Sequence, residues 1–232
     1  RTQITSILYI ICTEKDTLSH VKDGMFNNLE SFMGLSVENC RVSYMPGNFL
    51  SGLQSLEQIE IKSAGTLEME DSVFHQVPKL THVTIASSHV VKMPDLCKLS
   101  NLKFLNVSDN DFQSMESTGV LCKNDTVLPH LTTLILDKNS IFNISSGSLK
   151  SLPNLNDFRI ADGNLVNIEE DALSDIQKIT FLDLTNNAIS NVSVSQFSWN
   201  RELEVLGLGR NPLKQIHPKT FSSVKNLIVL TL

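Results

Sequence analysis

Hydrophobic residues recur along this chain in one fixed pattern. Its clearest copy follows the order L-x-x-L-x-L-x-x-N-x-L and has apolar or Asn residues at Leu131, Leu134, Leu136, Asn139, Ile141 and Ile144. The pattern restarts every 24 residues at Leu155, Ile179, Leu203 and Leu227. Towards the N-terminus it begins at Leu102, Leu80, Leu56, Phe32 and, less clearly, Leu8. Two spacings differ: 22 residues separate Leu80 from Leu102, and 29 separate Leu102 from Leu131. The longer spacing indicates an insertion of about five residues in an array of about ten repeats.

The alternation within each L-x-L predicts a short strand whose leucines face inward while the residues between them face outward. Such a strand cannot bury its apolar face alone, so neighbouring repeats must stack on it. The pattern therefore predicts an α/β solenoid, a leucine-rich-repeat horseshoe with a parallel, concave β-sheet. Phenylalanines recur 18 residues into several repeats, at Phe26, Phe74, Phe197 and Phe221. We expect their rings to fill a convex side made of loop or short 3₁₀ helix.

Residues 1–232 are predicted to form a single array, because no Pro-, Gly- or Ser-rich linker divides them. The last repeat stops at Leu232, and neither end carries a recognisable capping repeat. We therefore expect the array to be the N-terminal part of a longer protein. Asn110, Asn139, Asn187 and Asn211 hold the Asn position of their repeats. Their amides should pair with backbone groups of adjacent turns that would otherwise be buried without a partner.

Composition and motifs exclude several function classes. Nineteen Lys and Arg against 25 Asp and Glu leave a net charge of −6, which argues against nucleic acid as a partner. No apolar run reaches the roughly 18 residues that cross a bilayer. The sequence opens at Arg1 without the pattern of a signal peptide, so we expect any such leader to have been removed already. The six histidines lack metal-site spacing, and no nucleophile elbow or phosphate-binding loop occurs. We expect no catalytic residue, no metal, no cofactor and no enzymatic activity.

Four N-x-S/T sequons suggest an extracellular glycoprotein. Asn143 and Asn191 both lie 12 residues after the first leucine of their repeats, which predicts an exposed column on one flank. Asn124 lies in the insertion, and Asn106 points out of the concave face. The alternative is a cytosolic scaffold with four incidental, unoccupied sequons.

The four cysteines fall into two cases. Cys97 and Cys122 lie on convex loops of adjacent repeats, and we predict a disulfide that closes a 25-residue loop; two free thiols are the alternative. Cys40 holds the Asn position of its repeat, which favours a buried, unpaired thiol. Regular strand spacing argues against an unstrained Cys12–Cys40 bridge, so a partner for Cys12 outside this sequence is an equal alternative.

Several stretches resemble a known receptor family. Residues 10–12 (IIC), 35–42 (LSVENCRV) and 46–49 (PGNF) are similar to the opening repeats of invertebrate Toll receptors. Residues 96–108 (LCKLSNLKFLNVS), followed by a long repeat that carries Cys122, resemble a Cys-bearing repeat pair of the long, multi-cysteine-cluster Tolls. The repeats after Leu131 are generic.

The resemblance implies the ectodomain of a single-pass receptor on the cell surface, active in innate immunity or development. Its membrane anchor and its cytoplasmic signalling domain would lie outside this sequence, and receptor dimerisation is part of what the family suggests. The implied ligand is a secreted cystine-knot cytokine. The alternative is a cell-surface recognition protein that binds an adhesion receptor of the latrophilin type in trans.

Solenoids bind through their extended faces, so the outward strand residues are the candidate contacts. In the early repeats these are Glu14, Glu38, Gln58, Glu60, Lys62, His82 and Thr84. In the middle repeats they are Phe104, Ile135, Asp137, Asp157, Arg159, Phe181 and Asp183. The acidic early group suits a basic ligand. The middle group predicts a hot-spot patch, although single exposed apolar residues are also ordinary. A glycan on Asn106 would push partners towards the early repeats or a lateral flank.

Overall fold

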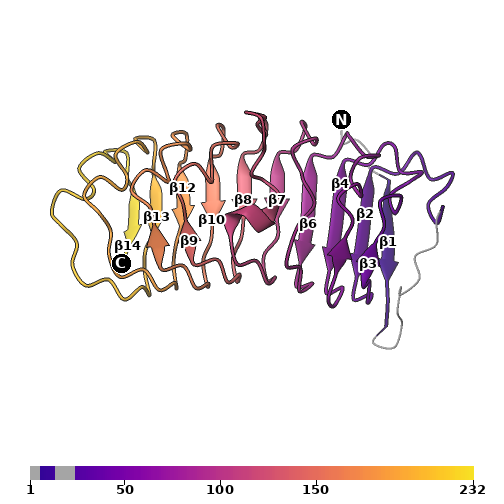
Figure 1. Cartoon of the computed structure of the whole chain (residues 1–232), viewed down its shortest axis with the longest axis horizontal. Helices are drawn as coiled ribbons and strands as arrows, with labels where there is room; N and C mark the ends of the chain where they lie inside the picture. The colour runs from indigo at the N-terminus through magenta and orange to yellow at the C-terminus, as the bar shows by residue number, and fades with distance from the viewer. Residues whose placement is uncertain (1–5, 14–23) are drawn as a thin grey trace.

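Each repeat contributes one short strand to a continuous parallel sheet (Figure 1). A computed structural model describes residues 6–13 and 24–232. The strands stack in chain order as β1 (Ile7–Ile11), β2 (Gly34–Glu38), β4 (Gln58–Lys62), β6 (His82–Ala86), β7 (Phe104–Asn106), β8 (Thr133–Ile135), β10 (Asp157–Arg159), β12 (Phe181–Asp183), β13 (Val205–Gly207) and β14 (Val229–Thr231). The chain returns from each strand to the next through turns on the opposite side. The predicted leucine-rich-repeat solenoid is confirmed.

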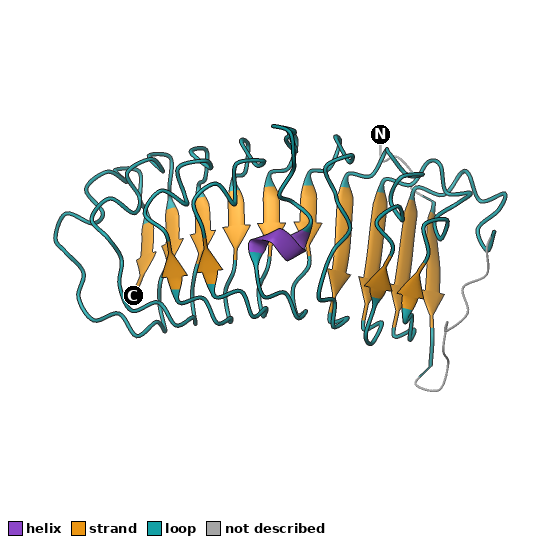
Figure 2. Cartoon of the chain, viewed as in Figure 1, coloured by secondary structure: helices purple, strands orange, loops and turns teal. Residues whose placement is uncertain are grey.

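The opposite side of the solenoid is almost entirely turn and loop (Figure 2). It carries two short parallel pairs, β3 (Tyr44–Met45) with β5 (Glu68–Met69) and β9 (Asn143–Ile144) with β11 (Asn167–Ile168). The single helix of the described ranges is the 3₁₀ turn η1 (Met115–Thr118), which lies in the long repeat between β7 and β8. No helix in the part of the chain that is described has the length and apolar character needed to span a bilayer.

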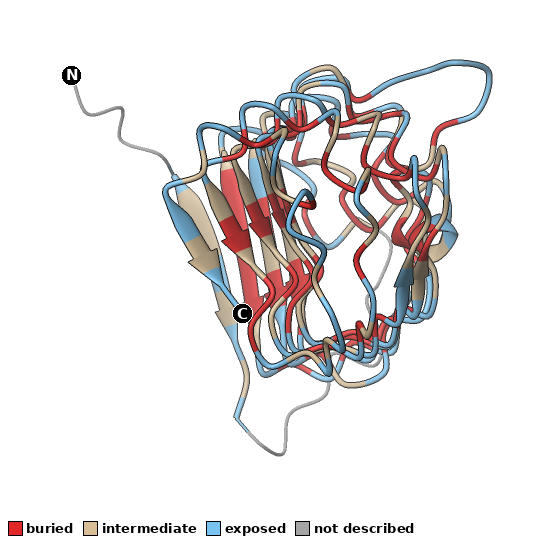
Figure 3. Ribbon diagram, turned by 90° about the vertical axis from the view of Figure 1, so that its left-hand side faces the viewer, coloured by how far each residue is buried: buried red, intermediate tan, exposed pale blue. Residues whose placement is uncertain are grey.

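The core runs between the sheet and the convex turns (Figure 3). Inward strand residues such as Leu105, Leu134 and Leu182 have no exposed surface. On the convex side the rings of Phe197 and Phe221 stack with centroids 6.0 Å apart. Phe26 instead meets Phe49 edge-on at 5.5 Å. Leu149 and Leu173 hold the equivalent positions of the middle repeats and are buried, so the aromatic column is interrupted by leucine.

Buried asparagines join the turns at the end of the strands, as predicted. Asn110 accepts from the backbone N–H groups of Ser88 (3.2 Å) and Val90 (3.1 Å) of the preceding repeat. Its Nδ2 donates to the carbonyls of Ile85 (2.7 Å) and Val107 (3.0 Å). Ser88 replaces Asn one repeat earlier, where its Oγ accepts from Ala64 N–H and donates to the Ala86 carbonyl. Buried backbone groups are thus paired across repeat boundaries.

The first repeat is shifted relative to the expectation from the sequence. Leu8 pairs in register with Leu35 rather than with Phe32, so it holds the second apolar position of the repeat pattern and not the first. Ile7, Tyr9 and Ile11 consequently form the outward positions of β1. The sequence prediction of the register was wrong because apolar residues occur on both faces of this strand. Glu14, predicted as an outward strand residue, lies outside the described residues.

Two glutamates brace successive repeats on one flank. A carboxylate oxygen of Glu70 accepts from the backbone N–H of Gly47 at 2.8 Å, and Glu169 accepts from the N–H of Ser146 at 2.8 Å. These backbone hydrogen bonds are the main reason why the pKa of each glutamate lies below its usual value, and hydrogen bonds from Ser72 and Asn143 add to the effect. Each carboxylate is therefore tied to the repeat before its own.

A lowered native pKa makes this brace pH-dependent. It stabilises the fold fully above the unfolded-state pKa of about 4.3 and is lost as the pH falls through the lower native pKa. We expect Glu70→Gln/Glu169→Gln to unfold at a lower urea concentration than the parent at pH 7, with the difference closing below about pH 4. Urea unfolding at pH 7, 5, 4 and 3 measures this. The control is Glu68→Gln, whose side chain accepts no hydrogen bond within the described ranges. An equal difference at every pH would contradict the prediction.

Candidate binding site on the concave face

The parallel register places the predicted outward residues in rows that cross the concave face. One row contains Gln58, His82, Phe104, Asp157 and Phe181, and the next contains Glu60, Thr84, Ile135, Arg159 and Asp183. Glu38 pairs with Lys62 in a third row, and Asp137 lies just beyond β8. Phe104 and Phe181 do not form one patch, because Thr133 and Asp157 stand between them in their row. The structure therefore separates these two aromatic residues of the middle group.

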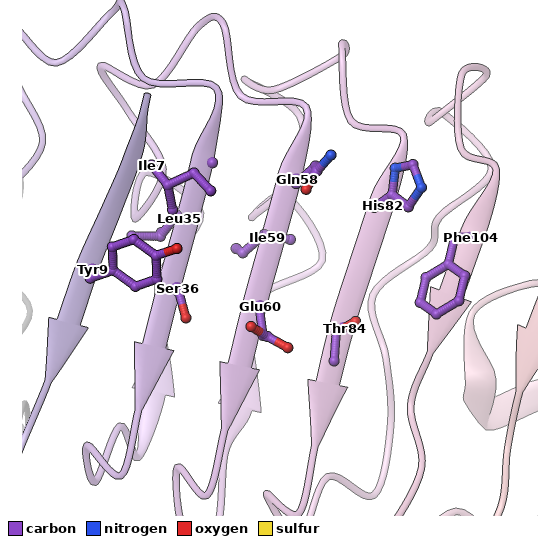
Figure 4. A pocket seen from close by; sticks show the side chains of 11 residues that line it. Ile7, Tyr9, Leu35, Ser36, Gln58, Ile59, Glu60, His82, Thr84 and Phe104 are labelled. Carbon is purple, nitrogen blue, oxygen red and sulfur yellow. The ribbon is translucent and has the colours of Figure 1, made fainter. Parts of the chain in front are cut away.

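A hollow of about 210 Å³ opens in the concave face over β1, β2, β4, β6 and β7 (Figure 4). Ser36 leaves room for it, because this small residue lies between the larger side chains of Tyr9 and Glu60 on the neighbouring strands, whereas Ile7 covers Gly34. Tyr9, which is 62% exposed, stands on one side. Glu60 lies towards the middle, and His82 and Phe104 stand on the far side. Sequence reasoning missed Tyr9, Gly34 and Ser36, although the correct register of β1 would have pointed to Tyr9.

The His82 ring forms a neutral aromatic wall with Phe104. The two rings stack with centroids 5.7 Å apart. Thr81 Oγ1 donates to the Glu57 carbonyl at 3.0 Å and lies 2.8 Å from His82 Nδ1. Since a hydroxyl has a single hydrogen, Nδ1 donates to Thr81 and Nε2 is left as an acceptor. Burial, and then the positive charge of Lys103, lowers the pKa of His82, so the ring is uncharged at neutral pH.

Glu60 and Lys62 form an ion pair along β4. Lys62 Nζ lies 2.5 Å from Glu60 Oε1, and both side chains remain substantially exposed. The pKa of Lys62 is raised, chiefly by its hydrogen bond to Glu60 and less by the charge of Glu38. The early concave face is therefore less acidic than its count of carboxylates suggests, because one of them is already paired.

Arg159 is held by its own neighbours. Its Nε and Nη2 donate to the two carboxylate oxygens of Asp157 at 2.9 and 2.8 Å. The guanidinium carbon lies 4.6 Å from the centroid of the Phe181 ring on the next strand, within the range of a cation–π interaction. Asp137, which accepts from Ala161 N–H at 2.7 Å, has a pKa raised mainly by burial. The charged groups of Asp157, Arg159 and Asp137 thus already have partners within the chain.

Two disulfides join neighbouring repeats. Cys97 is bonded to Cys122 across a Cα–Cα distance of 5.6 Å, which is the pair expected from the sequence. Cys12 is bonded to Cys40 across 4.9 Å. The expectation of an unpaired Cys40 and the spacing argument against this bridge were wrong. Because β1 is shifted in register, Cys12 at the end of β1 lies beside the end of β2, and its N–H donates to the Glu38 carbonyl.

The sequons lie in different environments. Asn124 and Asn191 are exposed. Asn143 is half-buried on β9, and its Nδ2 donates to Ser145 Oγ at 2.7 Å and to Glu169. It is therefore part of the flank brace rather than of a free column. Asn106 lies on the concave face between Thr84 and Ile135. Among the residues described, no group of three or more His, Cys, Asp or Glu residues could hold a metal ion.

Known proteins share this repeat pattern and this shape. Residues 3–117 match the model for BspA type leucine rich repeat regions, and residues 129–189 match a second leucine rich repeat model. Toll-like receptor 7 of Drosophila melanogaster is 24% identical over 125 residues, which are 50% of this chain and 9% of that receptor. The chain therefore spans only a small part of this relative.

Solved structures of three leucine-rich-repeat arrays superpose on the fold. The TLR13–ssRNA13 complex gives a TM-score of 0.79 at 22% identity and covers 95% of this chain and 31% of that one. The leucine-rich repeat domain of APL1B gives 0.71 at 14% identity, with 90% and 58% covered. Internalin C2 of Listeria monocytogenes gives 0.66 at 22% identity, with 88% and 83% covered. With two family models that together span most of its length, this chain belongs to the leucine-rich-repeat family and is related to Toll-like receptors.

Proposed function

We propose that this array is the ligand-binding part of a Toll-type cell-surface receptor and that it binds a protein through the concave face of β1, β2, β4, β6 and β7. The observation that carries the proposal is the hollow beside Glu60, where aromatic walls, a carboxylate and small residues meet. Concave pockets with a few converging polar groups are typical binding sites. The relation to a fly Toll-like receptor supports the receptor class.

An extracellular location is part of the proposal. Two disulfides join neighbouring repeats, and such bonds persist in oxidising compartments and are rare in the cytosol. The exposed sequons Asn124 and Asn191 are open to glycosylation. A glycan on Asn106 would stand between Ile135 and Thr84, at the edge of the hollow, and would leave the part of the concave face over β1, β2 and β4 accessible.

Charge favours a protein over a nucleic acid as the ligand. The TLR13 structure is a complex with single-stranded RNA, but this chain has a net charge of −6. Its concave rows contain the carboxylates of Glu38, Glu60, Asp157 and Asp183. Nucleic-acid binding depends on Lys and Arg that neutralise phosphates. The carboxylates on this face would repel the phosphates.

A binding screen tests the proposal. The secreted, complete ectodomain is tested at physiological salt against extracellular proteins of its own organism and against single-stranded RNA. A secreted cystine-knot protein as the partner would make this a cytokine receptor. An adhesion receptor as the partner would make it a contact-recognition module. Binding of RNA in place of any protein would overturn the proposal.

Charge reversal locates the binding face. We expect Glu38→Arg/Glu60→Arg to weaken the binding of the partner identified in the screen by about tenfold or more, because like charges placed opposite each other are costly in an interface. Surface plasmon resonance on immobilised variants measures the affinity. Glu68→Arg/Asp71→Arg is the matched control, with the same change of charge away from the concave sheet, and should bind as the parent does. Unchanged affinity of the first variant would exclude the early concave face.

A further inference from the structure

We propose that the hollow binds one arginine side chain of the protein ligand, and that this arginine takes the place of Lys62 at Glu60. The inference rests on the proposed function of the concave face and names the chemistry that the face recognises. A volume of about 210 Å³ is smaller than a typical small-molecule pocket. It offers room for a single long side chain that protrudes from a partner.

The same sheet already shows how it holds a guanidinium group. Arg159 donates two hydrogen bonds to Asp157, at 2.9 and 2.8 Å, and lies over the Phe181 ring of the adjacent strand. A carboxylate and an aromatic ring on neighbouring strands therefore form a seat for arginine on this face. The planar group satisfies both at once, because its edge donates hydrogen bonds while its face stacks on the ring.

The hollow contains the same two kinds of group without an arginine. Glu60 lies on β4, His82 lies on the adjacent β6, and the ring of Phe104 continues the wall on β7. Figure 4 shows the Glu60 carboxylate between Tyr9 on one side and the His82 and Phe104 rings on the other. The small side chain of Ser36, which lies between Tyr9 and Glu60 in the register, leaves the space in which the stem of the arginine would lie.

Lys62 holds Glu60 weakly enough to be displaced. The side chains of Lys62 and Glu60 are 46% and 38% exposed, and exposed ion pairs contribute little to stability. An arginine would make two parallel hydrogen bonds to Glu60, where Lys62 offers a single point contact. The uncharged His82 ring, whose Nδ1 lies 2.8 Å from the Thr81 hydroxyl, adds no positive charge that would oppose the incoming cation.

The experiment uses N-acetyl-arginine methylamide as the probe and the 232-residue chain with both disulfides intact. NMR titration follows the ring protons of Tyr9 and Phe104. We expect a saturable, millimolar interaction with the arginine probe and at least about tenfold weaker binding of the uncharged citrulline analogue. Equal shifts with citrulline, or tighter binding of the lysine analogue, would overturn the assignment of arginine.

Two variants change the affinity in opposite directions. Glu60→Gln should weaken the binding of the arginine probe about tenfold or more, because the charged acceptor is lost. Lys62→Gln should strengthen the binding of the probe about two- to fivefold, because the internal competitor for Glu60 is removed. Lys138→Gln, which makes the same change of charge outside the hollow, is the control and should leave the affinity unchanged. Loss of binding in Lys62→Gln would contradict displacement, and a merely structural role of the ion pair would not produce a gain.

The outcomes separate this inference from the proposed function. In one outcome the arginine probe does not bind, but charge reversal of Glu38 and Glu60 abolishes the binding of a protein partner. The proposed concave binding site then stands and the arginine seat is wrong. If the probe binds and responds to both variants but no protein partner is found, the seat stands and the receptor function is wrong. A partner whose binding survives both replacement of its protruding arginines and Glu60→Gln would also overturn the seat.

Discussion

Replacement of Asn139 by alanine is expected to lower the free energy of unfolding by about 2–4 kcal/mol. The Asn139 side chain is 5% exposed. Its Oδ1 accepts from Phe112 N–H at 3.1 Å, and its Nδ2 donates to the carbonyls of Val107 and Leu136 at 3.0 Å each. Alanine supplies none of these groups, so the Phe112 N–H and the Leu136 carbonyl would remain buried without partners, while the Val107 carbonyl would keep only its bond from Asn110.

Urea unfolding of the whole chain measures this loss. Asn164→Ala is the matched control, because Asn164 is exposed and no side-chain hydrogen bond joins it to the described residues. It should change the stability by less than about 0.5 kcal/mol. In a solenoid the loss is local, so hydrogen exchange should rise first at Phe112 and its neighbouring turn. A loss in Asn139→Ala no larger than that of the control would show that water or a rearranged turn replaces the amide.

Removal of the second disulfide should have an effect of similar size. We expect Cys97→Ala/Cys122→Ala to lose about 3 kcal/mol, because the bridge closes a loop of 25 residues and restricts the unfolded chain. The bridge joins the loop after Leu96 to the long repeat that contains η1. Without it, that repeat is held by packing and by the bond from Cys122 N–H to Ser151 Oγ.

Two measurements check this prediction. Peptide mass spectrometry without reductant should show Cys97 and Cys122 linked, and alkylation of both thiols would contradict the pairing. Urea unfolding then compares the double variant with the parent. Leu121→Ala, next to Cys122 and only partly buried, controls for the loss of side-chain packing in the same loop. Equal stability of parent and double variant would mean that the bridge adds no constraint to the unfolded chain.

The N-terminal repeat shows where sequence reasoning stops. Leu8, Ile10 and Cys12 alternate with Ile7, Tyr9 and Ile11, and both sets are largely apolar. Hydrophobic periodicity alone therefore does not say which set faces the core, and a shift of the register exchanges the two faces of a strand. Pairing of Leu8 with Leu35 decides the question. It puts Tyr9 beside the hollow and brings Cys12 to Cys40.

The candidate site was visible in part. Outward positions such as Glu60, His82 and Phe104 follow from the repeat period, because the period alone assigns the two faces of each strand. Their partners do not. Lys62 pairs with Glu60, and Arg159 is taken up by Asp157 and Phe181. Both ion pairs depend on side-chain conformations along a single strand, and the contact of Arg159 with Phe181 depends also on the neighbouring strand.

The sequence by itself determined the repeat, the solenoid, the inward leucines and the asparagine ladder, because each depends on a local pattern repeated along the chain. Tertiary structure alone decided the register of the first strand, the Cys12–Cys40 bridge and the hollow between Tyr9 and Phe104. These features arise between repeats, where small residues on one strand and large residues on the next meet at a spacing of about 4.8 Å. Periodicity specifies each repeat, but only the stacked array places one repeat against another.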